Sequence, residues 1–89
     1  MNLKISASTK FKKDIKKLSA TRLAKVGEIV NLLASGKELP EANRDHQLKG
    51  RYGEFRECHV EPDLLLIYQI VGNELELYLV RTGSHSQLF

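Results

Sequence analysis

The sequence has one cysteine, no tryptophan and two prolines among its 89 residues. With a single thiol, Cys58, the chain cannot form an internal disulfide, and we expect it to work in a reducing compartment. No apolar run approaches the roughly 20 residues that a membrane-spanning helix requires, and the N-terminus lacks the continuous apolar stretch of a secretory signal. These absences argue against a disulfide-stapled secreted protein and a membrane protein, and predict a cytoplasmic one.

The composition that is present is typical of a globular protein. Hydrophobic residues make up 42% of the chain and charged residues 28%, which favours a folded chain over a disordered one. A length of 89 residues is enough for one hydrophobic core and too little for two. We therefore expect a single domain over residues 1–89, and a monomer when no partner is bound.

Positive charge is concentrated at one end of the chain. The formal net charge is +3, but residues 1–26 carry +7 and the remaining residues carry −4. The N-terminal segment has one acid, Asp14, and eight basic residues: Lys4, Lys10, Lys12, Lys13, Lys16, Lys17, Arg22 and Lys25. Such a patch favours a polyanion, with nucleic acid as the first candidate. A solvated lysine-rich helix face would give the same pattern.

Hydrophobic spacing predicts one strand and two helices in the first part of the chain. A short strand is expected at residues 3–6, followed by a helix that starts near Lys10. A second amphipathic helix is expected between Ser19 and a C-cap at Gly36. Gly27 lies inside this second helix, where glycine costs roughly 1 kcal/mol relative to alanine. We therefore expect Gly27 to pack closely against a neighbouring segment.

The second half of the chain predicts an antiparallel meander after a long connection at residues 37–53. Turns are expected at Pro62-Asp63 and at Gly72-Asn73, and the middle strand is apolar on both faces, as a central strand should be. The expected strands are residues 54–60, 64–71 and 74–82. The predicted fold is therefore α+β with two layers: β-α-α followed by the meander, with the helix pair packed on one face of the sheet.

Four residues with acid–base or phosphate-binding chemistry are expected at one rim of this sheet: His59, Asp63, Arg81 and His85. The third histidine, His46, lies in the long connection. His59 and Asp63 flank the first turn of the meander. The third strand returns to the same rim and brings Arg81 there, with His85 just beyond. Strand alternation further predicts that Arg81 shares a face with the leucines of its own strand.

These residue types suit the cleavage of RNA without a metal ion. The 2′-hydroxyl of RNA can attack the adjacent phosphate when a base, an acid and a cation are supplied. Histidine can take either proton role near neutral pH, because its reference pKa is about 6.5. Arginine binds phosphate through a bidentate fork, and a carboxylate such as Asp63 can orient a histidine.

Other interpretations of the same residues stay open at this point. A histidine taken singly is more often structural than catalytic. Cys58, His59 and Asp63 are of the types that bind zinc, but neighbouring strand residues point to opposite faces and no metal-ligand spacing is present. Cys58 also has no activating partner on its own face. The residues alone predict a small basic α+β domain with a His/Arg/Asp rim, and neither a metal nor a cofactor.

Three sequence blocks resemble a known family. DHQLKG at residues 45–50 resembles D-H-x-L-x-G, RECHVEPD at residues 56–63 is similar to R-[DE]-x-H-[VI]-x-P-D, and RTGSHSQLF at residues 81–89 resembles R-x-G-[ST]-H-x-x-L-F. These are blocks of the YafQ-like toxins of the RelE/ParE superfamily, in the same order and ending at the same place. The resemblance covers the whole chain, although the first 40 residues match only in hydrophobic pattern.

The resemblance implies a RelE-like fold and a bacterial type II toxin that is neutralised by a cognate antitoxin. It implies an endoribonuclease of the mRNA interferase type, which enters the ribosomal A site and cuts the bound messenger. The resemblance also implies roles for individual residues. His46 and His59 match histidines that are implicated in proton transfer, and Asp63 matches the carboxylate beside them. Arg81 matches the arginine that holds the scissile phosphate, and His85 matches a proposed general acid.

Three further residues are expected to bind the substrate. Phe89 matches the terminal aromatic residue that positions the nucleotide, by stacking on it. Lys49 and Arg56 lie within the matching blocks and carry the positive charge that RNA attracts. One departure is Leu64, which stands where some relatives have tryptophan, so a base-stacking contact is expected to be missing there.

Other functions are compatible with the same sequence. A ribonuclease that does not need the ribosome would use the same residues. A toxin of the ParE type, which blocks DNA gyrase without cutting RNA, would share the fold but would not need the histidines. A toxin that survives only as an antitoxin-bound co-repressor is the third alternative, and the intact His/Arg/Asp set argues against it.

Overall fold

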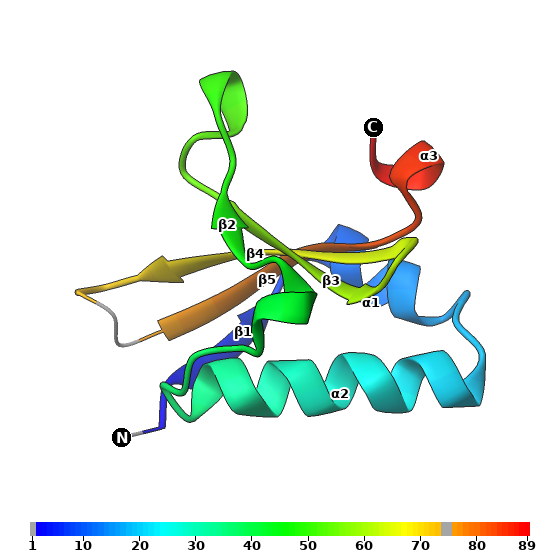
Figure 1. The fold of residues 1–89 in the computed structure, drawn as a ribbon, viewed down its shortest axis with the longest axis horizontal. Coiled ribbons are helices and arrows are strands. Elements are labelled where there is room, and N and C mark those ends of the chain that lie inside the picture. The colour runs from blue at the N-terminus through cyan, green and yellow to red at the C-terminus, as the bar shows by residue number, and fades with distance from the viewer. Residues whose placement is uncertain (1, 74–75) are drawn as a thin grey trace.

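A computed structural model describes residues 2–73 and 76–89 of the chain (Figure 1). Its elements are, in order, β1 Lys4–Ala7, α1 Thr9–Ile15, α2 Ala20–Ala34, the 3-10 turn η1 Glu41–Asn43, β2 His46–Gln47, the 3-10 turn η2 Gly50–Tyr52, β3 Arg56–Glu61, β4 Leu64–Val71, β5 Glu76–Gly83 and α3 His85–Leu88. No helix among the described residues is both long and apolar enough to cross a bilayer.

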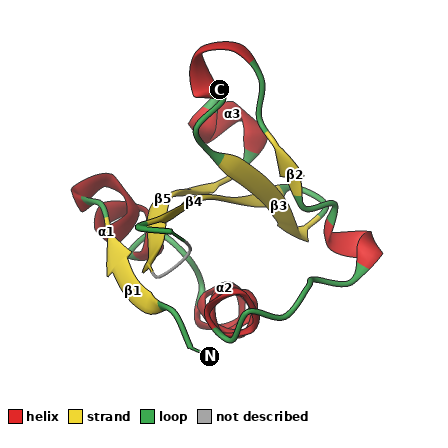
Figure 2. Cartoon of the chain, turned by 90° about the vertical axis from the view of Figure 1, so that its left-hand side faces the viewer, coloured by secondary structure: helices red, strands yellow, loops and turns green. Residues whose placement is uncertain are grey.

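The strands form one five-stranded sheet in the order β1-β5-β4-β3-β2. β1 and β5 run parallel, and the other neighbouring strands run antiparallel. Helix α2 lies across one face of the sheet, whereas α3 and the η2 turn project from the opposite face (Figures 1 and 2). The predicted α+β fold, with its helix pair followed by a meander, is confirmed.

The core lies between the helices and one face of the sheet. Helices α1 and α2 bury Phe11, Val26, Ile29, Leu33 and Ala34 against Cys58, Leu64, Leu66, Tyr68, Leu77 and Leu79 of the sheet. Strand β4 is also covered on its other face, where Leu65 and Ile67 are buried. The prediction of a central strand that is apolar on both faces is therefore confirmed.

Serine side chains start both long helices. Ser8 Oγ accepts a hydrogen bond from the Phe11 amide at 2.9 Å, and Ser19 Oγ accepts one from the Arg22 amide at 3.2 Å. Each bond satisfies an amide that has no partner inside the helix. The expected close packing of Gly27 was wrong, because a Cβ atom built on this residue would meet nothing within 4 Å.

A bulge in β5 decides where its side chains point. Leu79 pairs with Tyr68 and Arg81 pairs with Ile67, so Val80 is an extra residue in β5. Cross-strand partners share a face, so Leu79 faces the core with Tyr68, and Arg81 faces the opposite side with Ile67. The expectation that Arg81 shares a face with the leucines of its strand was therefore wrong, because the bulge interrupts the alternation.

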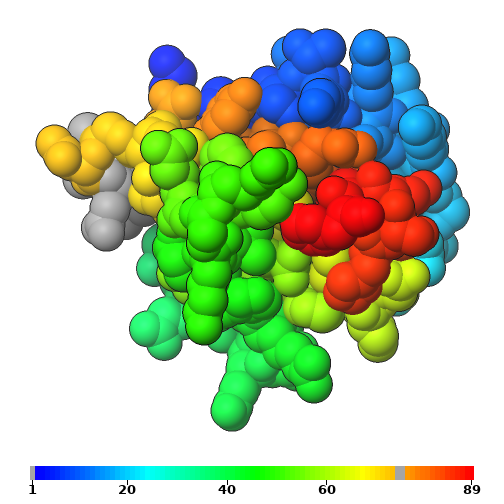
Figure 3. Space-filling model, turned by 90° about the horizontal axis from the view of Figure 1, so that it is seen from above, coloured from blue at the N-terminus to red at the C-terminus, as the bar shows by residue number. Residues whose placement is uncertain are grey.

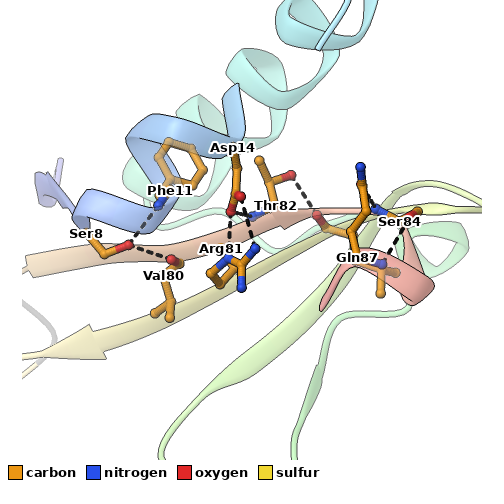
Figure 4. A network of polar contacts seen from close by, with 9 residues as sticks. Ser8, Phe11, Asp14, Val80, Arg81, Thr82, Ser84 and Gln87 are labelled. Carbon is orange, nitrogen blue, oxygen red and sulfur yellow. Dashed lines mark hydrogen bonds and ion pairs between the residues drawn. The ribbon is translucent and has the colours of Figure 1, made fainter. Parts of the chain in front are cut away.

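Helix α1 covers the edge of β5 beyond the point where β1 ends. The Ser8 amide donates to Leu79 O at 2.9 Å, and Ser8 Oγ donates to Val80 O at 2.5 Å. Further along, the Thr82 amide donates to Asp14 Oδ2 at 3.1 Å. Figure 4 shows the contacts of Ser8 with Val80 and of Asp14 with Thr82 along the strand. Side chains of the first helical segment thus satisfy backbone groups that no strand reaches.

Both predicted turns are present. Pro62 and Asp63 join β3 to β4. Gly72 and Asn73 follow β4 as a turn, with positive φ angles of 65° and 59°. The start predicted for the last strand, at residues 74–75, lies outside the described residues. The expectations missed β2, which falls in the supposed connection, and α3, which falls in the supposed tail.

Candidate active site

The candidate site lies on the face of the sheet opposite to α2. Cross-strand pairing places Glu57, Ile67 and Arg81 in one row of this face, and it places His59 beside Leu65 in the next. His46 of the short β2 pairs with Glu57 at the edge. Figure 3 looks onto this side, where the segment around β2 and η2, in green, lies beside the red C-terminal segment.

Glu57 is a buried carboxylate between two histidines. It is 7% exposed, and its Oε1 lies 3.7 Å from His46 Nε2 and 3.8 Å from His59 Nε2. These distances are too long for direct hydrogen bonds, but one carboxylate oxygen faces both imidazoles. Glu57 therefore lies within the range of a charge–charge interaction with both imidazoles.

His46 is held by the backbone on its other side. Its Nδ1 lies 2.7 Å from the carbonyl oxygen of Arg44, and a carbonyl can only accept, so Nδ1 carries a proton. In the neutral ring Nε2 is then the unprotonated nitrogen, the form that a general base requires. Arg44 has a φ of 49°, in the left-handed region that non-glycine residues rarely adopt, so a strained turn orients this histidine.

His85 and Asp63 form the exposed part of the site. Asp63 Oδ1 accepts hydrogen bonds from His85 Nδ1 at 2.7 Å and from the His85 amide at 3.0 Å. The amide and then the ring of His85 hold the pKa of Asp63 below its ordinary value. The same geometry fixes the proton on Nδ1 and leaves Nε2 free. The rings of His59 and His85 lie 5.7 Å apart between centroids, so the site brings these two histidines together.

A capping box orients the helix that carries His85. Ser84 Oγ accepts from the Gln87 amide at 3.3 Å, while Gln87 Oε1 accepts from the Ser84 amide at 2.8 Å (Figure 4). Gly83 precedes this cap with a φ of 157°, and a Cβ there would lie 2.8 Å from Gln87 Oε1. A side chain at this position would therefore strain the backbone and displace the Gln87 side chain from the capping box.

Arg81 is held by Asp14 of α1. Its Nε donates to Asp14 Oδ2 at 2.7 Å, and its Nη2 donates to Oδ1 at 3.0 Å (Figure 4). Burial alone would raise the pKa of Asp14, but the bonds from Arg81 and the Thr82 amide outweigh burial and lower it. One edge of the guanidinium is thus occupied, and both Nη1 hydrogens remain for a phosphate oxygen.

Further positively charged side chains line a hollow beside Arg81. It lies between the end of α1, the start of α2 and α3, and its lining includes Lys17, Arg22, Arg81 and Gln87. Arg22 Nε also pairs with Glu61 Oε1 at 3.0 Å. The lysine-rich segment singled out in the sequence therefore reaches the site face through Lys17.

The structure separates the three expected substrate-binding residues. Phe89 ends α3 and contacts Tyr52 of η2, and Lys49 is exposed at the start of η2. Arg56 is not brought to the site. It pairs with Tyr68 on the core face, where its Nε lies 3.3 Å from both Asp45 Oδ1 and Tyr68 Oη. We therefore assign Arg56 to the fold rather than to substrate binding.

The structure also bears on three other features of the sequence: Cys58, the possible zinc site and Leu64. Cys58 is fully buried in the core, and burial raises the pKa of its thiol to about 12, so it is a neutral packing residue. Across residues 2–73 and 76–89, no three His, Cys, Asp or Glu side chains are grouped so that they could hold a metal ion. Leu64 is also fully buried in the core, so this position offers no surface for base stacking.

Three residues that contact the predicted site residues were missed in the sequence. Glu57 belongs to the same block as His59, and its place two residues earlier on one strand face was the available signal. Asp14 is the only acid among the first 26 residues. It therefore stood out in the sequence, but nothing there indicated that it pairs with Arg81. Tyr52 had no signal at all, because only the folded chain brings it to Phe89.

Comparison with known proteins identifies relatives of the chain. A family model described as the bacterial toxin of type II toxin–antitoxin systems, YafQ, matches residues 3–89. The mRNA interferase toxin YafQ of Escherichia coli K12 is 36% identical, over 96% of this chain and 94% of its own.

Solved structures show the same fold. A metal-bound toxin from Helicobacter pylori is 46% identical, with a TM-score of 0.84 over 98% of this chain and 99% of its own. YafQ in the E. coli DinJ–YafQ toxin–antitoxin complex is 35% identical, with a TM-score of 0.83 over 100% of this chain and 99% of its own. The family match over nearly the whole chain and these identities lead to one conclusion: the chain belongs to the YafQ family of toxins of bacterial type II toxin–antitoxin systems.

Proposed function

We propose that this YafQ toxin is an mRNA interferase that cuts messenger RNA in the ribosomal A site by metal-independent acid–base catalysis. The observation that carries the proposal is the pairing of two histidine–carboxylate units on one sheet face. One unit is His85 with Asp63, and the other is His59 with the buried Glu57. The two imidazole rings are 5.7 Å apart between centroids, close enough to act on opposite sides of one phosphate.

The proposed reaction is an attack within the RNA. A base removes the proton of the 2′-hydroxyl, the 2′-oxygen bonds to the adjacent phosphorus, and the bond from phosphorus to the 5′-oxygen breaks. An acid donates a proton to that departing oxygen. The products are a 2′,3′-cyclic phosphate, which water opens to a 3′-phosphate, and a 5′-hydroxyl.

His85 suits the role of the acid. Asp63 stabilises its imidazolium through Nδ1, and Nε2 is free to donate a proton to the departing oxygen. His46 and His59 suit the base side, because Glu57 faces both rings and can stabilise the proton that either one takes. Because both histidines lie beside the same carboxylate, we assign the base to this group of three.

Arg81 suits the phosphate. Asp14 holds one edge of the guanidinium, which orients the Nη1 hydrogens and limits the rotamer freedom lost on binding. Positive charge at this position stabilises the charge that develops on the phosphate oxygens in the transition state. Lys17 and Arg22, which line the same hollow, are suited to a neighbouring phosphate of the messenger.

The partners follow from the same chemistry. Five lysines of the α1 region, Lys10, Lys12, Lys13, Lys16 and Lys17, are exposed and suit contact with ribosomal RNA. We also propose a cognate antitoxin that covers this cationic surface or the catalytic face, as the E. coli toxin is bound in the DinJ–YafQ complex. The chain would act in the cytoplasm, where its messenger and ribosomes are.

The test is messenger cleavage by the purified toxin, with and without programmed ribosomes, with EDTA added to the naked-RNA arm. We expect cuts only on ribosomes, with 2′,3′-cyclic or 3′-phosphate ends. A His85→Ala variant should lose roughly 10²-fold or more in cleavage rate. Asn31→Ala, at an exposed position of α2, is the matched control and should cleave like the unmodified toxin.

Other outcomes would redirect the assignment. Cutting of naked RNA at the same toxin concentration would identify a ribosome-independent ribonuclease. Full cleavage by His85→Ala would overturn the catalytic assignment. If folded toxin cuts in neither arm, the mRNA interferase proposal is wrong, and gyrase inhibition and a co-repressor role become the functions to measure.

A further inference from the structure

Tyr52 and Phe89 form an exposed aromatic pair. Their ring centroids lie 6.0 Å apart and their planes meet at 85°, an edge-to-face contact. Tyr52 is 42% exposed and Phe89 is 57% exposed. Among the described residues, the other strongly exposed large hydrophobic side chains are Ile5 and Leu23, on β1 and α2. The contact therefore joins two rings without burying either of them.

The pair links the two segments that carry the acid–base groups. Tyr52 ends η2, just before β3 with Glu57 and His59, and Phe89 caps α3, which begins at His85. Both segments project from the same face of the sheet, as Figures 1 and 2 show, and Figure 3 shows them side by side. The aromatic surface thus adjoins the place where the scissile phosphate would lie.

Part of this aromatic surface is open to a ligand, because 42% of Tyr52 and 57% of Phe89 are exposed. An edge-to-face contact uses one face of one ring and only the rim of the other. The guanidinium of Arg51 lies 6.0 Å from the Tyr52 centroid, at a cation–π distance. Flat ring faces next to a cation suit a nucleotide, because the base can stack on the ring while the cation meets the phosphate.

We propose that Tyr52 is a substrate-positioning residue, and that with Phe89 it forms a platform on which a base flanking the scissile phosphate stacks. Arg51 would contact the phosphate of the same nucleotide. The inference rests on the proposed function and deepens it, because it names the part of the RNA that this surface holds. It also supplies a stacking surface that the buried Leu64 cannot provide.

A structural role is the competing explanation, in which the two rings only hold α3 against η2. The two roles differ in what the RNA base does. The experiment compares cleavage on programmed ribosomes of a messenger with all its bases and of messengers in which one nucleotide flanking the cut is abasic. Each is cut by the unmodified toxin and by Tyr52→Ala, Tyr52→Phe and Leu23→Ala. Leu23 is 43% exposed and serves as the matched control.

With the intact messenger, Tyr52→Ala should raise the half-saturating toxin concentration or slow cleavage by roughly tenfold. Tyr52→Phe, which keeps the ring, should recover cleavage to within about threefold, and Leu23→Ala should cleave like the unmodified toxin. Loss of the stacked base should slow the unmodified toxin by a similar factor. It should have little further effect on Tyr52→Ala, because the stacking partner is already missing.

The inference is overturned if, at every flanking position, removing the base slows Tyr52→Ala by the same factor as it slows the unmodified toxin. The ring and the base would then act independently. The inference is also overturned if Tyr52→Ala cleaves normally while the unmodified toxin cuts ribosomal messenger as proposed. If the unmodified toxin does not cut at all, the proposed function itself has failed. Thermal unfolding of each variant identifies any loss that comes from the fold.

Discussion

Glu57 connects the two histidines of the base group at the scale of single residues. It is nearly inaccessible to water, and its cross-strand partner on β4 is the apolar Ile67. A buried carboxylate is costly unless charge compensates it. His46 and His59 are the groups that can compensate it, and a proton on either ring would do so.

Replacing Glu57 with glutamine should therefore reduce catalysis more than stability. The amide keeps the shape but cannot stabilise an imidazolium, so we expect roughly a 10²-fold loss in single-turnover cleavage on ribosomes. Glu28→Gln, at an exposed site of α2, should cleave normally and serves as the control. Equal rates for the two variants would remove Glu57 from the mechanism.

Asp14 predicts an acid-sensitive contribution to stability. Because its folded-state pKa lies below the ordinary value of 3.8, its contribution is complete well above pH 3.8 and is lost as the pH falls through the lower folded-state value. Asp14→Asn should destabilise the toxin by about 1–3 kcal/mol at neutral pH, since it removes bonds to a charged group.

Urea unfolding at several pH values measures this difference. The gap between the unmodified toxin and Asp14→Asn should be widest at neutral pH and should narrow below pH 4. A gap that stays constant down to the lowest pH at which the protein folds would show that the Asp14 charge is not its source.

At the scale of elements, the helices and the meander could be predicted because each follows a regular hydrophobic period. The short elements could not be predicted in the same way. β2 has two residues, and its pairing with β3 leaves no period to detect. α3 has four residues, but its capping box of Ser84 and Gln87 is a local signal that would have identified its start.

The candidate site was likewise only partly predictable from the sequence. The matching sequence blocks predicted roles for the three histidines, Asp63 and Arg81, and the turn between β3 and β4 predicted that His59 and Asp63 lie near each other. The orientation of Arg81 could not be predicted, because it depends on the extra residue Val80, and a bulge leaves no trace in a hydrophobic pattern.

Gly27 offers a test within α2. Its added Cβ would meet nothing within 4 Å, so alanine should be accommodated and should lower the conformational entropy of the unfolded chain. We expect Gly27→Ala to stabilise the toxin by about 0.5–1 kcal/mol. Thermal unfolding should show a higher Tm with unchanged cleavage activity. A lower Tm would mean that the space beside Gly27 is needed by a neighbouring group.

At the scale of the whole molecule, the two faces of the sheet have different roles. One face holds the core against α1 and α2, and the other carries the histidines, Arg81 and the aromatic pair. Substitutions on the second face can therefore alter chemistry while leaving most of the buried apolar surface in place. Asp14 is the exception, because it belongs to α1 and yet holds Arg81.

The uneven charge predicts a salt-dependent antitoxin complex. The first 26 residues carry +7 and the rest of the chain −4, so an antitoxin that covers the cationic end should bind more tightly at low ionic strength. Titration calorimetry at low and high salt should show affinity falling by about tenfold or more. Equal affinity at both salt concentrations would mean that the antitoxin does not use this charge.

The bulge at Val80 makes the direction of Arg81 depend on the path of the backbone rather than on residue identity. In a relative whose last strand has the same residues but a regular ladder, the arginine two places after the leucine would share its face and turn toward the apolar core. An alignment would match the two arginines, although only the one that follows a bulge would reach the face that carries the histidines. The pairing of this strand with its neighbour is therefore a separate test of whether a relative has the site.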